Sequence, residues 1–336
     1  MAQTNEVVDL APAAPGLVPD GGWAIDHRVE QKTRSRDSWG LALRRDWRMY
    51  TFVVLPVISL LVFRYVPMFG NIIAFRMYIP GGSPVGEQWA GWSYFQMAFS
   101  SPAFWSVFWN TVILGVLSLV IGFPLPIVLA LLLNELRSRK LKKTVQTITY
   151  LPHFLSIVIV AGIVLQLTSV NTGGINQMLH WFGIGPINFM QDPSWFRPIY
   201  VISGVWQTVG WGTILYLAAL TTIDDGLYEA ARIDGANRWQ QTWHITLPGI
   251  RPTIVVLLIL NIGSVVNVGF EKVLLLQNPL IYSTGDVINT YLYRVGIQTG
   301  QFSYATAIGL FEAVIGLVLV VSANLTSRKL VGASLW

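Results

Sequence analysis

Five polar side chains stand out because they lie within long apolar stretches of the sequence. Gln207 and Trp211 are separated by one helical interval of four residues, as are Asn267 and Glu271, and Glu312 lies alone. Residues four apart share one face of a helix. Because a polar or ionisable group is expensive to keep in lipid, it marks a functional site by default. These five residues are therefore the candidates for contact with a polar solute.

Four of the five candidates also have a structural interpretation. The two amides could simply join neighbouring helices by hydrogen bonds. Glu271 could pair with Lys272 or with Arg64, and Glu312 could hold a partner subunit. The sequence leaves both interpretations open.

The composition indicates an integral membrane protein. Of the 336 residues, 53% are hydrophobic and only 12% are charged, whereas soluble domains carry about 25% charged residues. Cysteine is absent and the four histidines show no ligand spacing, so we expect neither disulfides nor a bound metal. The basic residues that give the net charge of +5 cluster in short loops beside apolar stretches, which indicates membrane topology, not a nucleic-acid surface.

Apolar stretches of about 20 residues predict membrane-spanning helices. The expected fold is all-α and polytopic, with a disordered cytoplasmic tail (1–43), a first transmembrane helix with an extracellular loop (44–106) and a core transmembrane domain (107–330). The fifth span is expected to be one continuous helix on which Gly263, Asn267 and Glu271 share a face. The six expected spans are 50–69, 107–133, 145–167, 198–220, 253–276 and 303–325.

The distribution of positive charge predicts the orientation. Most of the 22 lysine and arginine residues fall in alternate loops that share one side of the membrane. Since such loops are cytoplasmic, both termini and the charged segment at 224–248 are expected in the cytoplasm.

The segment 224–248 predicts two short helices. Thr222, Asp224 or Asp225 could cap a first helix, and Gly235 is suited to end it. A second helix should follow at 237–243, with Trp239, Trp243 and Leu247 on one face, and Pro248 is expected to close it.

The spacing within this segment resembles a known cytoplasmic signature. Glu229-Ala230-Ala231, three residues, Gly235, nine residues and then Ile245-x-Leu247-Pro248 are similar to the signature of binding-protein-dependent ABC importer permeases. Asp234 and Thr246 resemble the sugar-importer branch. The resemblance covers residues 40–330 and implies a type I ABC importer permease-like fold. It also implies an ATPase-coupling role for Glu229, Ala230, Ala231, Asp234, Gly235, Ala236, Ile245, Leu247 and Pro248.

Two further motifs resemble the carbohydrate-uptake class, in its polysaccharide and oligosaccharide branch. They are the arginine-rich lead into the first span and the pair of runs at 278–282 and 286–291. The implied function is that of a permease subunit that imports saccharides, and oligosaccharides in particular, across the plasma membrane of a prokaryote. Carboxylates and amides on the candidate path would bind hydroxyl groups, and an indole would stack on a sugar ring.

The resemblance also implies partners. They are a second permease subunit, two cytoplasmic ABC ATPase subunits that use ATP and Mg, an extracellular solute-binding protein, the sugar itself and membrane lipid, with no nucleic acid. The sequence contains no G-x-x-x-x-G-K-[ST] pattern, so we expect no ATP site, cofactor or enzymatic activity in this chain.

An ion-coupled secondary carrier is the alternative. Such carriers need buried carboxylates, which Glu271 and Glu312 could supply, and usually contain repeated halves. No repeat is visible in the sequence, and the charged segment would remain unexplained. An intramembrane enzyme is disfavoured because the chain has no cysteine and no H-E-x-x-H motif.

Overall fold

A computed structural model describes residues 47–331, and the expected tail at 1–43 lies outside them. The described residues are mostly helical, with one two-stranded antiparallel ribbon formed by β1 (Arg76–Met77) and β2 (Gln88–Trp89). The chain divides after residue 61 into two units, which are described separately.

The described part of the first unit is the helix α2 (Trp47–Leu60), which contains Pro56 and has no buried residue. The helical backbone continues in the second unit through η1 (Leu61–Tyr65), α3 (Val66–Met68) and η2 (Phe69–Phe75). The whole stretch of 29 residues is long and apolar enough to cross a membrane. A helix that is apolar on all sides and exposed is suited to lipid, as predicted for the first span.

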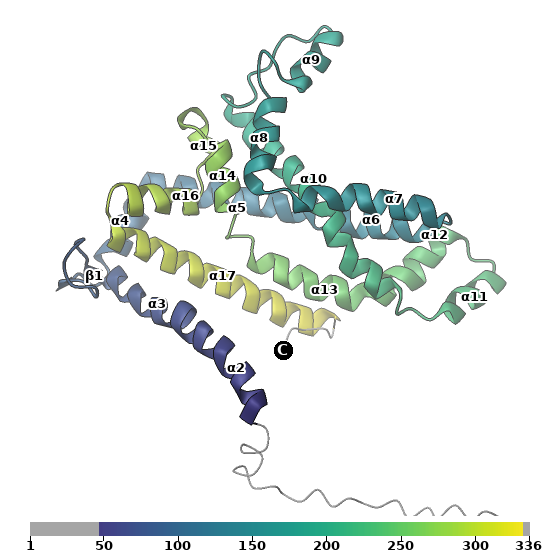
Figure 1. Cartoon of the computed structure of the whole chain (residues 1–336), viewed down its shortest axis with the longest axis horizontal. Coiled ribbons are helices and arrows are strands. Elements are labelled where there is room, and N and C mark those ends of the chain that lie inside the picture. Colours follow the sequence, from purple (N-terminus) through teal and green to yellow (C-terminus); the bar gives the residue numbers. More distant parts are fainter. Residues whose placement is uncertain (1–46, 332–336) are drawn as a thin grey trace, which may run out of the picture. The chain divides into compact units, whose positions relative to one another are not determined.

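The remaining elements of the second unit follow in chain order (Figure 1). They are α4 (Ser93–Ser100), α5 (Pro102–Gly122), α6 (Pro124–Glu135), α7 (Arg139–Tyr150), η3 (Leu151–Phe154), α8 (Ile157–Leu167), α9 (Gly174–Trp181), α10 (Pro193–Leu220), α11 (Asp225–Ile233), α12 (Arg238–Gln241), η4 (Thr242–Thr246), α13 (Leu247–Gly263), α14 (Phe270–Leu276), η5 (Pro279–Ile281), α15 (Tyr282–Gly285), α16 (Ile288–Leu292), η6 (Tyr293–Gln298) and α17 (Phe302–Val331).

Four helical stretches in the described residues have the length and composition of membrane spans. The bent pair of α7 and α8 makes a fifth if it is counted as one span. The remaining predicted span corresponds to α10, which has 28 residues but is less apolar. The four stretches are Trp47–Phe75, Pro102–Glu135, Arg238–Gly263 and Phe302–Lys329.

The predicted third span is not a single straight helix. The helical stretches Arg139–Phe154 and Ile157–Leu167 meet at an angle of 100°. Pro152 lies in the short η3 turn before the bend, where it cannot donate a helical hydrogen bond. Ser156 then starts α8, because its side chain accepts a hydrogen bond from the Ile159 backbone N–H at 3.3 Å.

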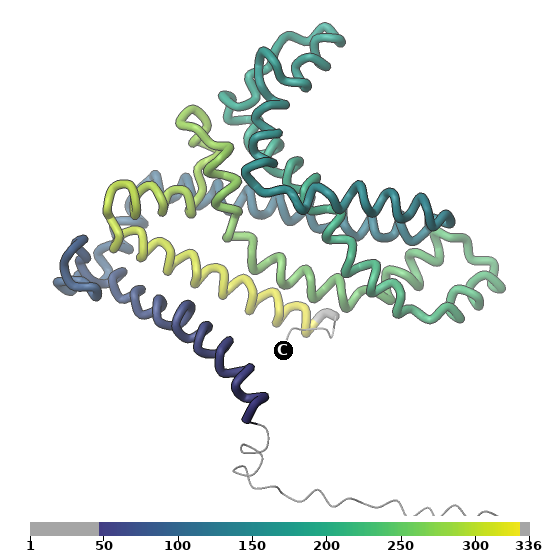
Figure 2. The backbone as a smooth tube through the Cα atoms, in the orientation of Figure 1, coloured from purple at the N-terminus to yellow at the C-terminus, as the bar shows by residue number. Residues whose placement is uncertain are grey.

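The predicted fifth span is also broken, so the prediction of a shared face for Gly263, Asn267 and Glu271 is wrong. The helix α13 ends at Gly263, and α14 begins at Phe270 after a non-helical stretch (Figure 2). The Ser264 hydroxyl donates to the Asn261 carbonyl at 2.8 Å. Serine and asparagine compete for backbone groups in this way, and glycine is a weak helix former, which together favour the break.

The break, residues 264–269, packs directly against α5. A Cβ atom added to Gly115 of α5 would lie 1.9 Å from the Val265 carbonyl oxygen. Only glycine permits such an approach of two backbones. Val266 and Val268, on either side of the exposed Asn267, are buried, so the break is held firmly in place.

Helix α10 contacts α5, α6, α7, α8 and α13. Its side of the core includes the buried aromatic residues Phe196, Tyr200 and Tyr216. It also approaches α7 closely, because a Cβ on Gly210 would lie 2.1 Å from the Thr149 carbonyl oxygen. This close packing leaves eight residues of α10 buried.

A buried polar network attaches the segment 282–298 to α5. The Asn110 side chain, 3% exposed, donates to the carbonyls of Ser283 and Asp286 at 3.0 and 3.2 Å and accepts from Arg197 at 2.8 Å. Asp286 also forms an ion pair with Arg294. Burial acts to lower the pKa of Arg294, but the hydrogen bond and the charge of Asp286 outweigh this effect and raise it.

Substitution of Gly115 by alanine should destabilise the protein. The added methyl group would collide with the Val265 carbonyl, and overpacking of this kind costs about 1–3 kcal/mol. The measurement is thermal denaturation of the purified protein in detergent.

Gly122→Ala is the matched control on the same helix, because its Cβ would meet no atom within 4 Å. It should leave stability unchanged or raise it slightly. Equal melting temperatures for the two variants would contradict the close approach.

Candidate functional site

The segment 224–248 forms the predicted helix, turn and helix. The Asp224 side chain caps α11 by accepting the Gly226 N–H at 3.0 Å. The helix ends before Gly235, whose φ of +79° is in the left-handed region that glycine adopts without strain. The next residues return the chain into α12, where Asn237 and Gln240 form a reciprocal capping box.

The prediction that Pro248 closes the second helix is wrong. Residues 238–263 form one continuous helical stretch, with a π-helical turn at 242–246. In this turn the Leu247 N–H bonds to the Thr242 carbonyl five residues earlier. Pro248 then lies in the first turn of α13, where the altered register accommodates a residue without an N–H.

The residues to which the resemblance assigns ATPase coupling differ in solvent exposure. Glu229, Ala230, Asp234, Gly235 and Pro248 are exposed, whereas Ala231, Ala236, Ile245 and Leu247 are half-buried. Large apolar side chains beside them are also exposed: Leu227, Ile233, Trp239 and Trp243. Ile233 is 87% exposed and the Trp239 and Trp243 rings are 5.7 Å apart. A surface that combines charge with exposed apolar groups is suited to a protein partner.

Two side-chain contacts fasten this segment to the rest of its unit. The Tyr228 and Thr246 hydroxyls are 3.0 Å apart and join α11 to the π-helical turn. Arg238 of α12 pairs with Glu135 at the end of α6 at 2.8 Å. Both partners of this ion pair are about half exposed, so it contributes at most about 1 kcal/mol, but it fixes which helix end faces α12.

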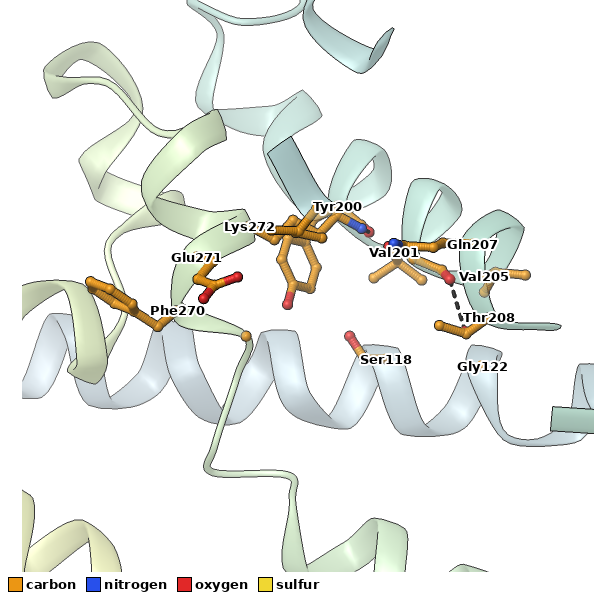
Figure 3. A pocket seen from close by; sticks show the side chains of 13 residues that line it. Ser118, Gly122, Tyr200, Val201, Val205, Gln207, Thr208, Phe270, Glu271 and Lys272 are labelled. Carbon is orange, nitrogen blue, oxygen red and sulfur yellow. Dashed lines mark hydrogen bonds between the residues drawn. The ribbon is translucent and has the colours of Figure 1, made fainter. Parts of the chain in front are cut away.

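A cavity of about 630 Å³ lies between α5, α8, α10 and α14. We call it the main cavity. Figure 3 shows Tyr200 and Lys272 together on one side and Ser118 on the helix that faces them. Its lining residues are Ser118, Gly122, Ile157, Tyr200, Val201, Gly204, Val205, Gln207, Thr208, Gly269, Phe270, Glu271 and Lys272.

A smaller cavity of about 190 Å³ adjoins the main cavity and shares Ser118, Tyr200 and Gly269 with it. Asn267 and Asn261 line this second space. The buried Ser118 hydroxyl, which lies between the two cavities, has no hydrogen-bond partner among residues 47–331. An unsatisfied hydroxyl of this kind is a ready partner for a hydroxylated ligand.

The break in the fifth span sets the places of Glu271 and Lys272. Both residues are in the first turn of α14, but Glu271 is exposed whereas Lys272 is 6% exposed. No ion pair joins Glu271 to Lys272 or to Arg64 in the described structure, so the pairing alternative is not supported. Instead, the Lys272 ammonium donates to the Tyr200 carbonyl at 2.9 Å and lies 4.6 Å from the centre of the Tyr200 ring.

Three of the five predicted path residues line one of these two cavities. Gln207 and Glu271 line the main cavity and Asn267 lines the smaller one. Trp211 lines neither, because its ring stacks on His153 at the bend between α7 and α8, with centroids 4.4 Å apart. Glu312 also lies outside both cavities. Its carboxylate accepts a hydrogen bond of 3.4 Å from Asn289, which also contacts Asn267 at 3.5 Å.

Three cavity residues were not predicted from the sequence: Ser118, Tyr200 and Lys272. Lys272 could have been found from its charge, but it was interpreted as a partner for Glu271. Tyr200 and Ser118 have no comparable signal, because hydroxyl side chains are common in membrane helices.

Comparison with known proteins matches residues 122–332 to the family described as "Binding-protein-dependent transport system inner membrane component". Two proteins of Bacillus subtilis (strain 168) are similar over most of their length. The polygalacturonan/rhamnogalacturonan transport system permease protein YteP is 47% identical over 91% of this chain and 95% of its own. Protein LplB is 46% identical over 87% of this chain and 92% of its own.

Solved structures agree with these similarities. A bacterial ABC transporter involved in the import of the acidic polysaccharide alginate matches with a TM-score of 0.81 and 46% identity, over 86% of this chain and 98% of that chain. A complex of the bacterial alginate transporter with an alginate pentasaccharide-bound periplasmic protein matches with a TM-score of 0.82 and 46% identity, over 88% and 98% of the two chains. The type I importer fold expected from the sequence is therefore confirmed.

The left-handed turn at Gly235 gives a prediction of its own. Alanine there meets no atom within 4 Å, so its cost is purely one of backbone conformation, about 1 kcal/mol. Gly235→Ala should therefore raise the amide exchange rates at the end of α11 about five-fold in hydrogen-exchange measurements.

Gly235→Asn is the control, because asparagine tolerates the left-handed region better than alanine does. Its exchange rates should remain closer to those of the natural chain. Equal rates in both variants would argue against a strained turn.

Proposed function

The chain belongs to the family of binding-protein-dependent transport system inner membrane components, and from this premise we propose that it is the permease subunit of an ATP-driven saccharide importer. The observation that carries the proposal is the geometry of the segment 224–248. It combines an exposed helix, a left-handed glycine and a capped second helix with exposed apolar side chains. An ion-coupled carrier is not retained, because the matching family depends on binding proteins.

The proposed substrate is an oligosaccharide. YteP is named as a permease for polygalacturonan and rhamnogalacturonan, and the solved transporter imports alginate. The main cavity offers groups that suit hydroxyl-rich ligands: Ser118, Gln207 and Glu271. Its volume of about 630 Å³ is within the range of about 300–1,000 Å³ found for small-ligand sites.

We propose that a separate ATPase binds the segment 224–248 and supplies the energy. Glu229 is exposed on α11 beside Ala230, where it can pair with a basic group of the ATPase. Gly235 provides the turn, and the exposed Ile233 and Trp239 are suited to an apolar part of the same interface. ATP and Mg would be bound by that ATPase, and this chain carries no P-loop sequence.

The proposed assembly contains this chain, a second permease subunit, two ATPase subunits and an extracellular solute-binding protein. The complex of the alginate transporter with its periplasmic protein supports the last of these partners. The charge distribution supports placing both termini and the segment 224–248 on the cytoplasmic side of a prokaryotic plasma membrane.

Glu229→Ala should abolish most ATP-dependent uptake. Loss of one partner of a desolvated charge pair at an interface costs about 2–5 kcal/mol, so uptake of a labelled oligosaccharide should fall at least about ten-fold. The measurement uses proteoliposomes that contain the complete transporter and its binding protein.

Asp225→Ala is the matched control, since Asp225 is an exposed acidic residue on the same helix. It should retain uptake and should co-purify with the ATPase. If Glu229→Ala also retains uptake and a bound ATPase, the coupling assignment is wrong. Gly235→Pro is a second disruptive variant, because proline cannot adopt the positive φ of this position.

A further inference from the structure

Lys272 is a buried cation whose charge is not neutralised within the described chain. Its side chain is 6% exposed, and no carboxylate among residues 47–331 lies within ion-pair distance of it. Within residues 47–331 its ammonium donates one hydrogen bond to the Tyr200 carbonyl and lies over the face of the Tyr200 ring. An ammonium group has three N–H donors, so donors remain for another acceptor.

A buried charge without a counter-ion is strongly unfavourable. A carbonyl and an aromatic face reduce this cost but do not cancel a full charge. The neighbouring Glu271 does not supply the counter-ion, although its carboxylate lies only one residue away in the chain. The position therefore favours an anion that arrives from outside this chain.

The surroundings of the ammonium leave a way for that anion to approach. Lys272 lines the main cavity, and Figure 3 shows its side chain extended along α10 beside Tyr200. A Cβ on Gly204 would lie 3.3 Å from the ammonium nitrogen, so this glycine keeps the wall of α10 open beside the charge. Ser118 lies on the facing helix with its hydroxyl unsatisfied.

We propose that Lys272 binds the carboxylate of an acidic sugar unit, so that the main cavity selects oligosaccharides that contain uronic acids. The proposal rests on the function proposed above. The sugar carboxylate would accept hydrogen bonds from the Lys272 ammonium. Sugar hydroxyls would contact Ser118 and the Glu271 carboxylate, and these opposite charges would fix the orientation of the ring.

The competing occupant is a carboxylate of the second permease subunit. In that case Lys272 would be structural, and its replacement would affect acidic and neutral sugars equally. The two cases therefore differ in the ratio of the affinities for acidic and neutral sugars. A general loss of protein stability does not change this ratio.

The experiment measures direct binding to the complete transporter in lipid nanodiscs, without nucleotide or binding protein. The probes are trigalacturonate and its methyl ester, which have the same sugar units but differ in charge. Saturation-transfer NMR or calorimetry gives a Kd for each probe. The variants are Lys272→Met and Lys272→Arg, with Lys143→Met as a control at an exposed lysine of α7.

The natural transporter should bind trigalacturonate more tightly than the ester. Lys272→Met should weaken trigalacturonate binding roughly ten-fold, as expected for the loss of one hydrogen bond to a charged group, and should change the ester little. Lys272→Arg should keep most of the preference, and Lys143→Met should keep all of it. An equal loss for both probes, or no loss for either, would overturn the proposal.

If Lys272→Met does not assemble, Lys272→Arg tests the residue, and the absence of any preference for the acid in the natural transporter still overturns the proposal. ATP-driven uptake of both probes by the natural importer separates this result from the proposed function. If both probes are taken up but bind equally well, the proposed saccharide import is retained and only the proposed role of Lys272 is wrong.

Discussion

The contact on which the transmembrane core depends most is the approach of the Val265 carbonyl to Gly115. A side chain at that position of α5 is sterically impossible without movement of the backbone. The contact fixes the break in the fifth span, and the break decides where α14 begins. Glu271 and Lys272 reach the main cavity only because α14 starts afresh at this point.

Buried hydrogen bonds hold the segment after α14 in position, as close packing holds the break. Inside a membrane protein, apolar contact alone does not distinguish protein from lipid, so polar ties carry much of the specificity. Asn110 donates hydrogen bonds to two backbone carbonyls of that segment, and the Thr111 hydroxyl accepts one from the Ile288 N–H at 2.8 Å. Asn278 likewise donates to the Met190 carbonyl at 2.7 Å. The runs at 278–282 and 286–291 therefore have a structural role.

The sequence was a good guide to features that depend on local chemistry. Caps such as Asp224, the turn at Gly235 and the positions of the apolar stretches follow from propensity and length alone. The bend after Pro152 and the break after Gly263 were not predicted, because membrane helices tolerate glycine and proline when neighbouring groups satisfy the backbone. Those neighbours are remote in sequence, and so the cavity assignments of Trp211 and Lys272 required the structure.

The unbroken run from Arg238 to Gly263 has a mechanical consequence. Its 26 residues, which include the π-helical turn at 242–246, extend over about 39 Å at 1.5 Å per residue. One end carries the ion pair with Glu135, and the other ends at the break beside the two cavities. A continuous helix transmits axial displacement along its length, and the break at its far end packs directly against α5. Motion imposed at α12 would therefore be felt first as a change in the shape of the cavities.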